Sequence, residues 1–105
     1  MIQRIANSTA LRRLLDTNYR VVTTFTAPKS EHCDELSAVV EELAKENPEV
    51  RFVTIDINEA GDLASQYKIS IAPTLVTFKN ERWVNTLASS DKHDVRQVVE
   101  ELTKI

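Results

Sequence analysis

The spacing of apolar residues in the middle of the chain predicts a strand followed by a long helix. From Arg20 to Thr26 the sequence is a run of valine, phenylalanine and threonine, residue types that favour a buried strand. Pro28 has no N–H to continue a ladder, so we expect the strand to end before it. From Ser30, whose hydroxyl can cap a helix, apolar residues recur at helical spacing as far as Asn47-Pro48. These apolar positions are Leu36, Val39, Val40 and Leu43.

Four other segments have the pattern of strands. Ile2 to Ile5 predicts a short strand, and Val50 to Ile57 alternates in a way that predicts a second buried strand. Thr74 to Lys79 and Arg82 to Leu87 predict a hairpin that turns at Asn80-Glu81.

Three more helices are expected around these strands. Asn7-Ser8-Thr9 can cap a first helix, residues 61–66 suit a short one, and Asp91 to Lys104 suits a closing helix. Their apolar stripes are Leu11, Leu14 and Leu15 in the first, and Val95, Val98, Val99 and Leu102 in the last. Strands alternating with helices, followed by a hairpin and a helix, predict an α/β fold with one mixed sheet covered on both faces.

The length, composition and net charge of the chain limit the classes of protein to which it can belong. A chain of 105 residues with 42% hydrophobic and 28% charged residues is expected to form one globular domain over residues 1–105. Its net charge of −3 and scattered basic residues argue against nucleic acid as a partner. No run approaches the roughly 18 apolar residues of a membrane span, so no membrane partner is expected.

The cysteine content bears on the compartment. Cys33 is the only cysteine, so no disulfide can form within the chain, which fits a reducing environment. The segment from Met1 to Ile5 has no long apolar stretch of the kind found in signal peptides. We therefore expect a cytoplasmic protein.

Two segments resemble the active-site region of the thioredoxin family. Phe25 to Cys33 is similar to the family's stretch in which Phe-x-Ala leads into Trp-Cys-x-x-Cys at a helix N-terminus. Tyr67 to Leu75 is similar to the segment before and through the family's cis-proline, with Pro73 at the proline position. The resemblance extends to Val53-Thr54-Ile55-Asp56, to Phe78-Lys79-Asn80 and to the closing helix, nearly the whole chain. It implies a thioredoxin fold, a central sheet with helices on its two sides, carrying a degenerate Ser-x-x-Cys motif.

The motif departs from the family at three positions. Ser30 stands in place of the first cysteine, Lys29 in place of the tryptophan before it, and Thr24 in place of the strand's buried acid. A serine oxygen is scarcely ionised near neutral pH and forms no stable link to sulfur, so the dithiol cycle is closed to the chain acting alone. Thr24 cannot accept a proton near pH 7. Lys29 and Glu31 make the docking surface charged where the family has a flat aromatic.

The state of the one thiol is left open by the sequence. Cys33 matches the family's resolving cysteine, the less exposed of the two sulfurs. Burial would disfavour the thiolate and leave Cys33 an inert packing residue. The helix dipole and a protonated His32 would favour the thiolate, while acids at Glu31, Asp34 and Glu35 oppose it.

The residues that bind peptide in the family are better retained than those that carry its redox chemistry. In the family's cis-proline loop, the backbone of the residue before proline pairs with an extended peptide, as in strand addition. The resemblance therefore implies a peptide site at Ala72, Pro73 and Thr74. With the motif-adjacent residues, it implies a docking face formed by Lys29 to His32, Ala72-Pro73 and Ala88-Ser89.

Two hypotheses of function follow. The first is an atypical thioredoxin-like domain that binds a protein or peptide client at the face of Ser30 and Pro73, with little or no oxidoreductase activity. The second is a single-thiol oxidoreductase or redox sensor that forms a mixed disulfide at Cys33. Neither requires a cofactor, and no metal site is expected because adjacent side chains from Glu31 to Glu35 fan apart on a helix. We expect a monomer, with a shared metal or a Cys33–Cys33 disulfide as the routes to a weak dimer.

Overall fold

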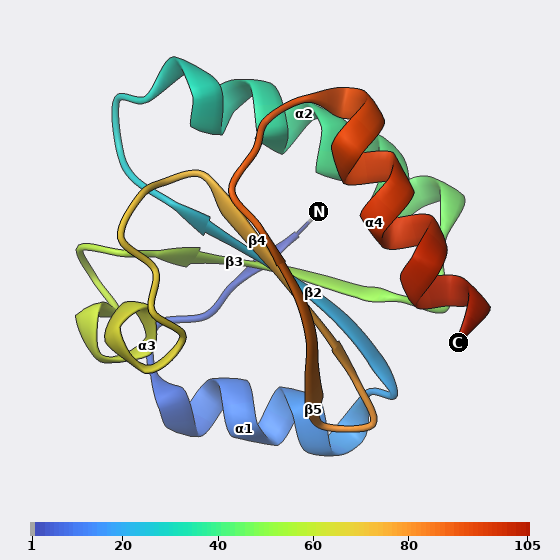
Figure 1. The fold of residues 1–105 in the computed structure, drawn as a ribbon. Helices are drawn as coiled ribbons and strands as arrows, with labels where there is room; N and C mark the ends of the chain where they lie inside the picture. The colour runs from blue at the N-terminus through green and yellow to red at the C-terminus, as the bar shows by residue number, and fades with distance from the viewer. Residues whose placement is uncertain (1) are drawn as a thin grey trace.

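The computed structural model describes residues 2–105 and places five strands and four helices in three layers (Figure 1). The strands are β1 (Gln3–Arg4), β2 (Arg20–Thr26), β3 (Arg51–Asp56), β4 (Thr74–Lys79) and β5 (Arg82–Leu87). The helices are α1 (Ser8–Thr17), α2 (Glu31–Glu46), α3 (Gly61–Gln66) and α4 (Lys92–Lys104). The sequence pattern predicted every one of these elements, and the expected α/β fold is confirmed.

The strands form one mixed sheet in the order β1-β3-β2-β4-β5. Strands β1 and β2 run parallel to β3 on either side of it, whereas β4 is antiparallel to both β2 and β5. The central strand β2 is hydrogen-bonded along both edges, which is why its five inner residues are all buried. The end of β2 therefore supplies a rigid base for the loop that follows it.

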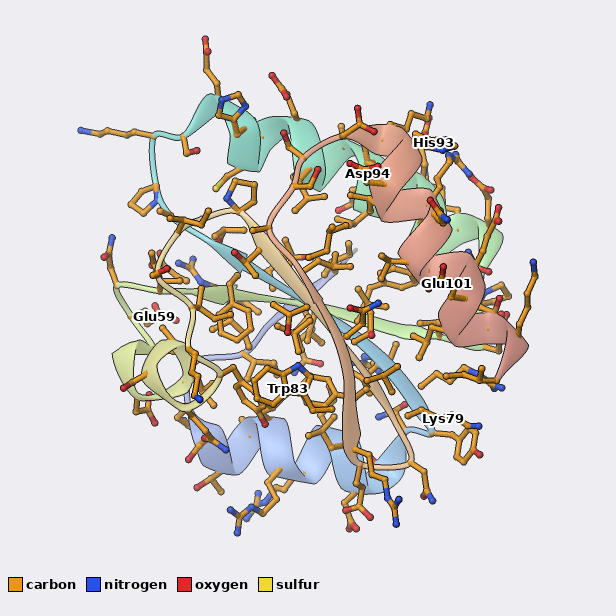
Figure 2. All side chains as sticks on the ribbon, viewed as in Figure 1. Glu59, Lys79, Trp83, His93, Asp94 and Glu101 are labelled. Carbon is orange, nitrogen blue, oxygen red and sulfur yellow. The ribbon has the colours of Figure 1, made fainter. Side chains whose placement is uncertain are left out.

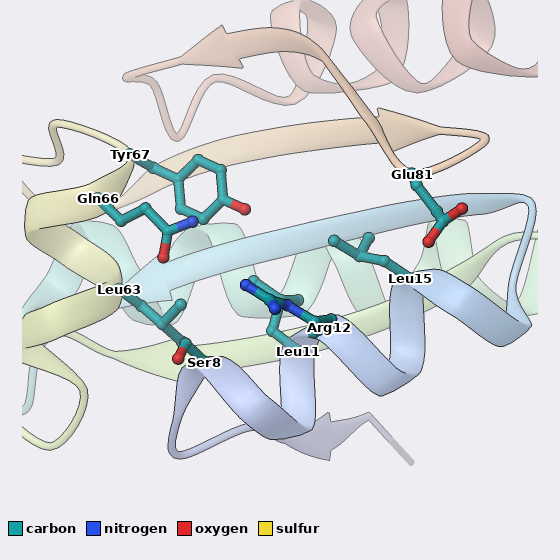
Figure 3. A pocket seen from close by; sticks show the side chains of 8 residues that line it. All are labelled: Ser8, Leu11, Arg12, Leu15, Leu63, Gln66, Tyr67 and Glu81. Carbon is teal, nitrogen blue, oxygen red and sulfur yellow. The ribbon is translucent and has the colours of Figure 1, made fainter.

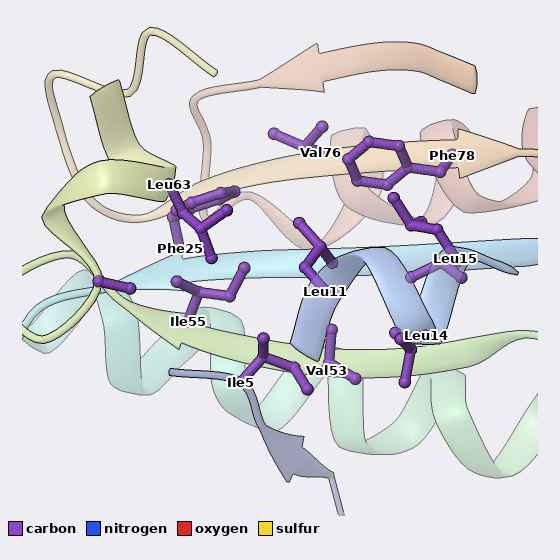
Figure 4. Close-up of a cluster of buried hydrophobic side chains, with 12 residues drawn as sticks. Ile5, Leu11, Leu14, Leu15, Phe25, Val53, Ile55, Leu63, Val76 and Phe78 are labelled. Atoms are coloured by element: carbon purple, nitrogen blue, oxygen red, sulfur yellow. The ribbon is translucent and has the colours of Figure 1, made fainter. Parts of the chain in front are cut away.

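Helices cover both faces of the sheet (Figure 1). Helices α1 and α3 lie on one face, where Leu11, Leu15 and Leu63 pack against Phe25 and Phe78 from the strands (Figure 4). Helices α2 and α4 lie on the other face over a second apolar cluster. That cluster comprises Val22, Leu36, Val39, Val40, Leu43, Val50, Phe52, Leu75, Val95, Val99 and Leu102. The central helix α2 thus rests on the sheet along its length, and its first turn lies beside the end of β2.

Strand β5 forms an edge of the sheet and is largely exposed. The pairing of β4 with β5 shifts register between Thr77 and Phe78, which leaves Val84 as the extra residue of a bulge in β5. Trp83 is 46% exposed and turns to the α1 side, where its ring meets Tyr67 edge-on at 5.1 Å (Figure 2). A bulge in an edge strand hinders pairing with another strand.

Several turns use non-glycine residues with positive φ, because the chain has a single glycine. Asn80 and Glu81 have φ of 51° and 68° and form the tight β4–β5 turn. Lys29 and Lys68 have φ of 59° and 58°. The left-handed Lys29 turns the chain sharply between β2 and α2, at the position where the motif begins.

Candidate functional site

The site begins with the N-terminus of α2. Ser30 is the N-cap, with extended backbone angles, and its Oγ accepts a hydrogen bond from the N–H of Cys33 at 3.3 Å. Glu31 and Asp34 lie in the first turn, where the helix dipole favours negative charge. The hydroxyl at the degenerate motif position therefore has a structural partner, a helix amide that would otherwise be unsatisfied.

The thiol of Cys33 lies beneath this cap. Cys33 is 5% exposed, and its Sγ accepts a hydrogen bond from the backbone N–H of Ala27 at 3.5 Å. The sulfur is thus directed to the end of β2 and away from solvent. A buried thiol is the less reactive form of cysteine because the thiolate loses its hydration.

The central strand below the motif carries no carboxylate. Thr24 is 2% exposed and lies opposite Thr54 on one neighbouring strand and Leu75 on the other. Among residues 2–105 the buried polar side chains are all threonines, namely Thr23, Thr24, Thr74 and Thr77. The part of the chain that the structure describes therefore offers no buried acid to take a proton from Cys33.

The loop before β4 lies beside the same end of β2. The Ala72–Pro73 peptide bond is cis, Pro73 is buried and Ala72 is half-buried. Thr74 pairs with Phe25 in the sheet, and its hydroxyl donates to the carbonyl of Ile71 at 2.7 Å. This hydroxyl holds the loop closed, so the Thr74 side chain serves the loop and does not line the surface groove described next.

A shallow groove of about 250 Å³ runs along this loop. It is lined by His32 of α2, by Ala72 and Pro73 of the loop, and by Ala88 after β5. The groove's remaining lining residues are Ile71, Ser89 and Ser90. Of the residues implied by the resemblance, the structure brings His32, Ala72, Pro73, Ala88 and Ser89 together here, whereas Lys29, Ser30, Glu31 and Cys33 lie outside the groove.

One carboxylate, that of Glu35, contacts two of the residues that line the groove. Oε2 of Glu35 lies 3.6 Å from Nδ1 of His32 and accepts a hydrogen bond from Oγ of Ser90 at 3.3 Å. Glu35 belongs to α2, and Ser90 to the connection between β5 and α4. The Glu35–Ser90 contact links α2 to the connection before α4, a relation between distant segments that the sequence pattern does not reveal.

Sequence reasoning missed Ile71 as a site residue. Its side chain is 58% exposed at the rim of the groove, although isoleucine is usually buried. Its place directly before Ala72-Pro73 was the one available signal. An exposed apolar side chain beside a groove is a feature of binding surfaces.

Neither a metal centre nor a membrane helix is found among residues 2–105. No group of three or more histidine, cysteine, aspartate or glutamate side chains in that range is placed to hold a metal ion. None of the described helices is both long enough and apolar enough to span a bilayer.

The sheet order, the motif at the start of α2 and the cis-proline loop together define a thioredoxin-fold domain with a single thiol. The comparisons agree. The family model described as Thioredoxin matches residues 3–101, and the chain belongs to the thioredoxin family.

Individual relatives show the same likeness. The chain is 33% identical over 79 residues to a thioredoxin of Mycoplasmoides gallisepticum, covering 75% of this chain and 79% of the relative. It is 31% identical over 68 residues to a thioredoxin of Echinococcus granulosus. The match covers 65% of this chain and 64% of that relative, so the chain spans slightly under two thirds of the relative's length. The solved structure of mitochondrial thioredoxin 3 from Saccharomyces cerevisiae superposes with a TM-score of 0.92 at 25% identity, covering 96% of this chain and 95% of the other.

Proposed function

We propose that this thioredoxin-like domain is a protein- or peptide-binding module with little or no dithiol oxidoreductase activity. One observation carries the proposal: the chain's single thiol is 5% exposed, and the other motif position holds a serine that caps α2. Disulfide exchange needs an accessible thiolate to attack and a second thiol to release the product. The domain has one thiol, turned inward, and so lacks both requirements.

The binding half of the proposal rests on the groove at the cis-proline loop. Ala72 and Pro73 line the groove beside the exposed side chain of Ile71, a combination that suits an extended peptide added alongside the loop. The serines and His32 on the walls can hydrogen-bond to a peptide backbone. A chain that cannot form an internal disulfide suits a reducing compartment such as the cytoplasm.

Burial also weighs against the single-thiol alternative. A Cys33 enzyme or sensor would need its sulfur to reach glutathione or a client thiol, and the sulfur instead contacts the amide of Ala27. We therefore treat Cys33 as a packing residue at the top of α2.

Peptide selection on wild-type protein tests the binding proposal. A phage-displayed library of random ten-residue peptides is enriched on immobilised wild-type domain, and the selected peptides are titrated against two variants. Ile71→Glu places a charge at the groove, whereas Val84→Glu places the same charge on the exposed β5 edge, at a side chain that is 42% exposed. We expect Ile71→Glu to weaken binding about tenfold or more and Val84→Glu to leave it within about twofold. Failure to enrich any peptide, or equal binding by both variants, contradicts the proposal.

The activity half has its own assay. Wild-type protein with dithiothreitol should reduce insulin no faster than a Cys33→Ala variant. A wild-type rate well above that control would show that Cys33 acts as a nucleophile despite its burial.

A further inference from the structure

A second hollow lies on the other face of the sheet, between α1, α3 and the β4–β5 turn (Figure 3). Its volume is about 270 Å³, close to the lower end of small-molecule sites. Helix α2, which carries the Ser30–Cys33 motif at its start, packs on the opposite face of the sheet. The two hollows share no lining residue, so this one is separate from the cis-proline groove.

The floor of the hollow is apolar and already formed. Leu11, Leu15 and Leu63 line it, and each is also a buried member of the core between the sheet and these helices. Side chains fixed on both sides by core packing cannot easily move to fill the space. These leucines are only 2%, 9% and 0% exposed, so a ligand would reach little of them and would lie chiefly against the half-buried ring of Tyr67.

One wall is the ring of Tyr67. The ring stands edge-on to Phe78 at 5.4 Å and to Trp83 at 5.1 Å, and is tilted against Phe25 at 6.3 Å. Three aromatic neighbours hold it in one orientation. Burial raises the pKa of the Tyr67 hydroxyl, while the positive charge of Arg12 acts in the opposite direction, so the hydroxyl is a neutral donor near the guanidinium at pH 7.

The rim carries polar groups that have no protein partner. Figure 3 shows Gln66 and Tyr67 at one end of the hollow, Glu81 at the other, and Arg12 on α1 between the two ends. Within residues 2–105, no hydrogen bond or ion pair to the protein is made by the side chains of Arg12, Gln66, Tyr67 or Glu81. Away from Glu81, the hollow thus presents the guanidinium of Arg12, the phenol of Tyr67 and the amide of Gln66, all able to donate.

We propose that this hollow binds a small organic anion with a flat apolar body. The guanidinium of Arg12 holds the carboxylate in a two-bond fork, with the Tyr67 hydroxyl as a further donor. The apolar body lies against the ring of Tyr67, above Leu11 and Leu63. Glu81 repels an anionic group from the hairpin end, so the ligand has one orientation, with its charge toward Tyr67.

Phenylacetate is a suitable probe, because it joins a carboxylate to a single ring and fits a hollow of this size. Phenylacetamide is its uncharged counterpart. Binding is followed by amide NMR shifts of the whole domain and by the fluorescence of Trp83, the chain's only tryptophan, which contacts the Tyr67 wall. We expect saturable shifts at Leu11, Leu63 and Tyr67 with a Kd on the order of 1 mM, and binding of phenylacetamide about tenfold weaker.

Neighbouring arginines supply a matched pair of variants. Arg12→Gln should weaken phenylacetate binding about tenfold, because it removes the charged fork. Arg13→Gln makes the same change of charge one residue along α1, at a side chain that does not line this hollow, and should leave the Kd within about twofold. Glu81→Gln should tighten binding a few fold by removing the repulsion. Both arginines are exposed, so unchanged amide spectra elsewhere will verify the fold.

Three outcomes overturn the proposal. They are no saturable phenylacetate binding up to about 50 mM, phenylacetamide binding as tightly as phenylacetate, and equal losses for Arg12→Gln and Arg13→Gln.

Discussion

The hydroxyl of Ser30 accepts a hydrogen bond from the backbone N–H of Cys33, with 3.3 Å between Oγ and N. The two motif positions are thus joined by a helix cap, and the thiol of Cys33 faces away from it, toward Ala27. A position that carries a nucleophile in the family's motif has here become part of the scaffold. The predictions below test this reading and two other features of the structure.

Removing the cap should destabilise the domain. Ser30→Ala leaves the N–H of Cys33 without its side-chain acceptor and should lower the free energy of unfolding by about 1 kcal/mol. Ser30→Asp should retain stability, since a carboxylate can cap and also favours the positive end of the dipole. Urea denaturation measures both. Ser37→Ala, on the exposed side of α2, is the control and should change stability by less than about 0.5 kcal/mol.

Restoring the missing thiol should restore part of the chemistry. Ser30→Cys places a second sulfur three residues before Cys33 on the first turn, so that a mixed disulfide can be resolved within the domain. We expect insulin reduction above the wild-type rate, at a reduced level because Thr24 supplies no proton acceptor. The same substitution combined with Cys33→Ala should lose this gain. Equal rates for the two variants would show that Cys33 does not resolve the intermediate.

The native thiol should react slowly with alkylating agents. At 5% exposure Cys33 reacts mainly when the structure opens, so its rate with iodoacetamide should be about 100-fold or more below the rate in urea. Mass spectrometry at successive times measures both rates. A native rate near the unfolded one would favour a single-thiol enzyme or sensor over a packing role.

Two buried threonines should respond in opposite ways to valine. Thr77 is 1% exposed and its Oγ1 has no partner among the described residues, so Thr77→Val removes an unsatisfied group and should stabilise by about 1 kcal/mol. Thr23 is also buried, but its hydroxyl donates to the carbonyl of Val76 at 3.0 Å. Thr23→Val should therefore cost about 1 kcal/mol. If Thr77→Val destabilises as Thr23→Val does, the hydroxyl of Thr77 has a partner in solution.

Tyr67 should make the domain less stable at alkaline pH. Burial raises its pKa above the ordinary value of 10.0, so the unfolded chain loses this proton at a lower pH than the folded protein. The free energy of unfolding then falls as the pH rises from the unfolded-state pKa toward the folded-state pKa, and is unaffected well below pH 10. Tyr67→Phe has no such group and should lose less stability between about pH 9 and 11. Identical slopes for the two proteins would exclude the effect.

The order and type of the elements could be read from the sequence because each element carries its own local signal. The threonine-valine run of β2 is buried on both faces, and helix α2 begins where Ser30 provides a cap. The chemical deficit could be read in the same way, since a chain with one cysteine has no second thiol wherever it folds. Ile71 could not be found so directly, because its exposure depends on the turn that precedes Pro73.

Whether the thiol of Cys33 is exposed and reactive could not be decided from the sequence. Burial and the helix dipole act on its thiol in opposite directions, and the sequence contains residues that support each effect. The geometry of the loop settled the exposure, because the left-handed turn at Lys29 places Ser30 at the cap and Cys33 one turn inside it. Similarly, the contact of Glu35 with Ser90 joins residues 55 positions apart, which no local pattern encodes.

By itself, the sequence determined the layered α/β fold and the loss of the dithiol pair, since these depend on local periodicity, cap residues and the count of cysteines, and the resemblance of two segments indicated the family. The tertiary structure alone decided that the remaining thiol is buried, that His32 and Ala88 line one groove, and that Arg12 and Tyr67 line another hollow. Each of these is a relation between segments far apart in the chain, and only the packing of helices on the sheet brings such segments together.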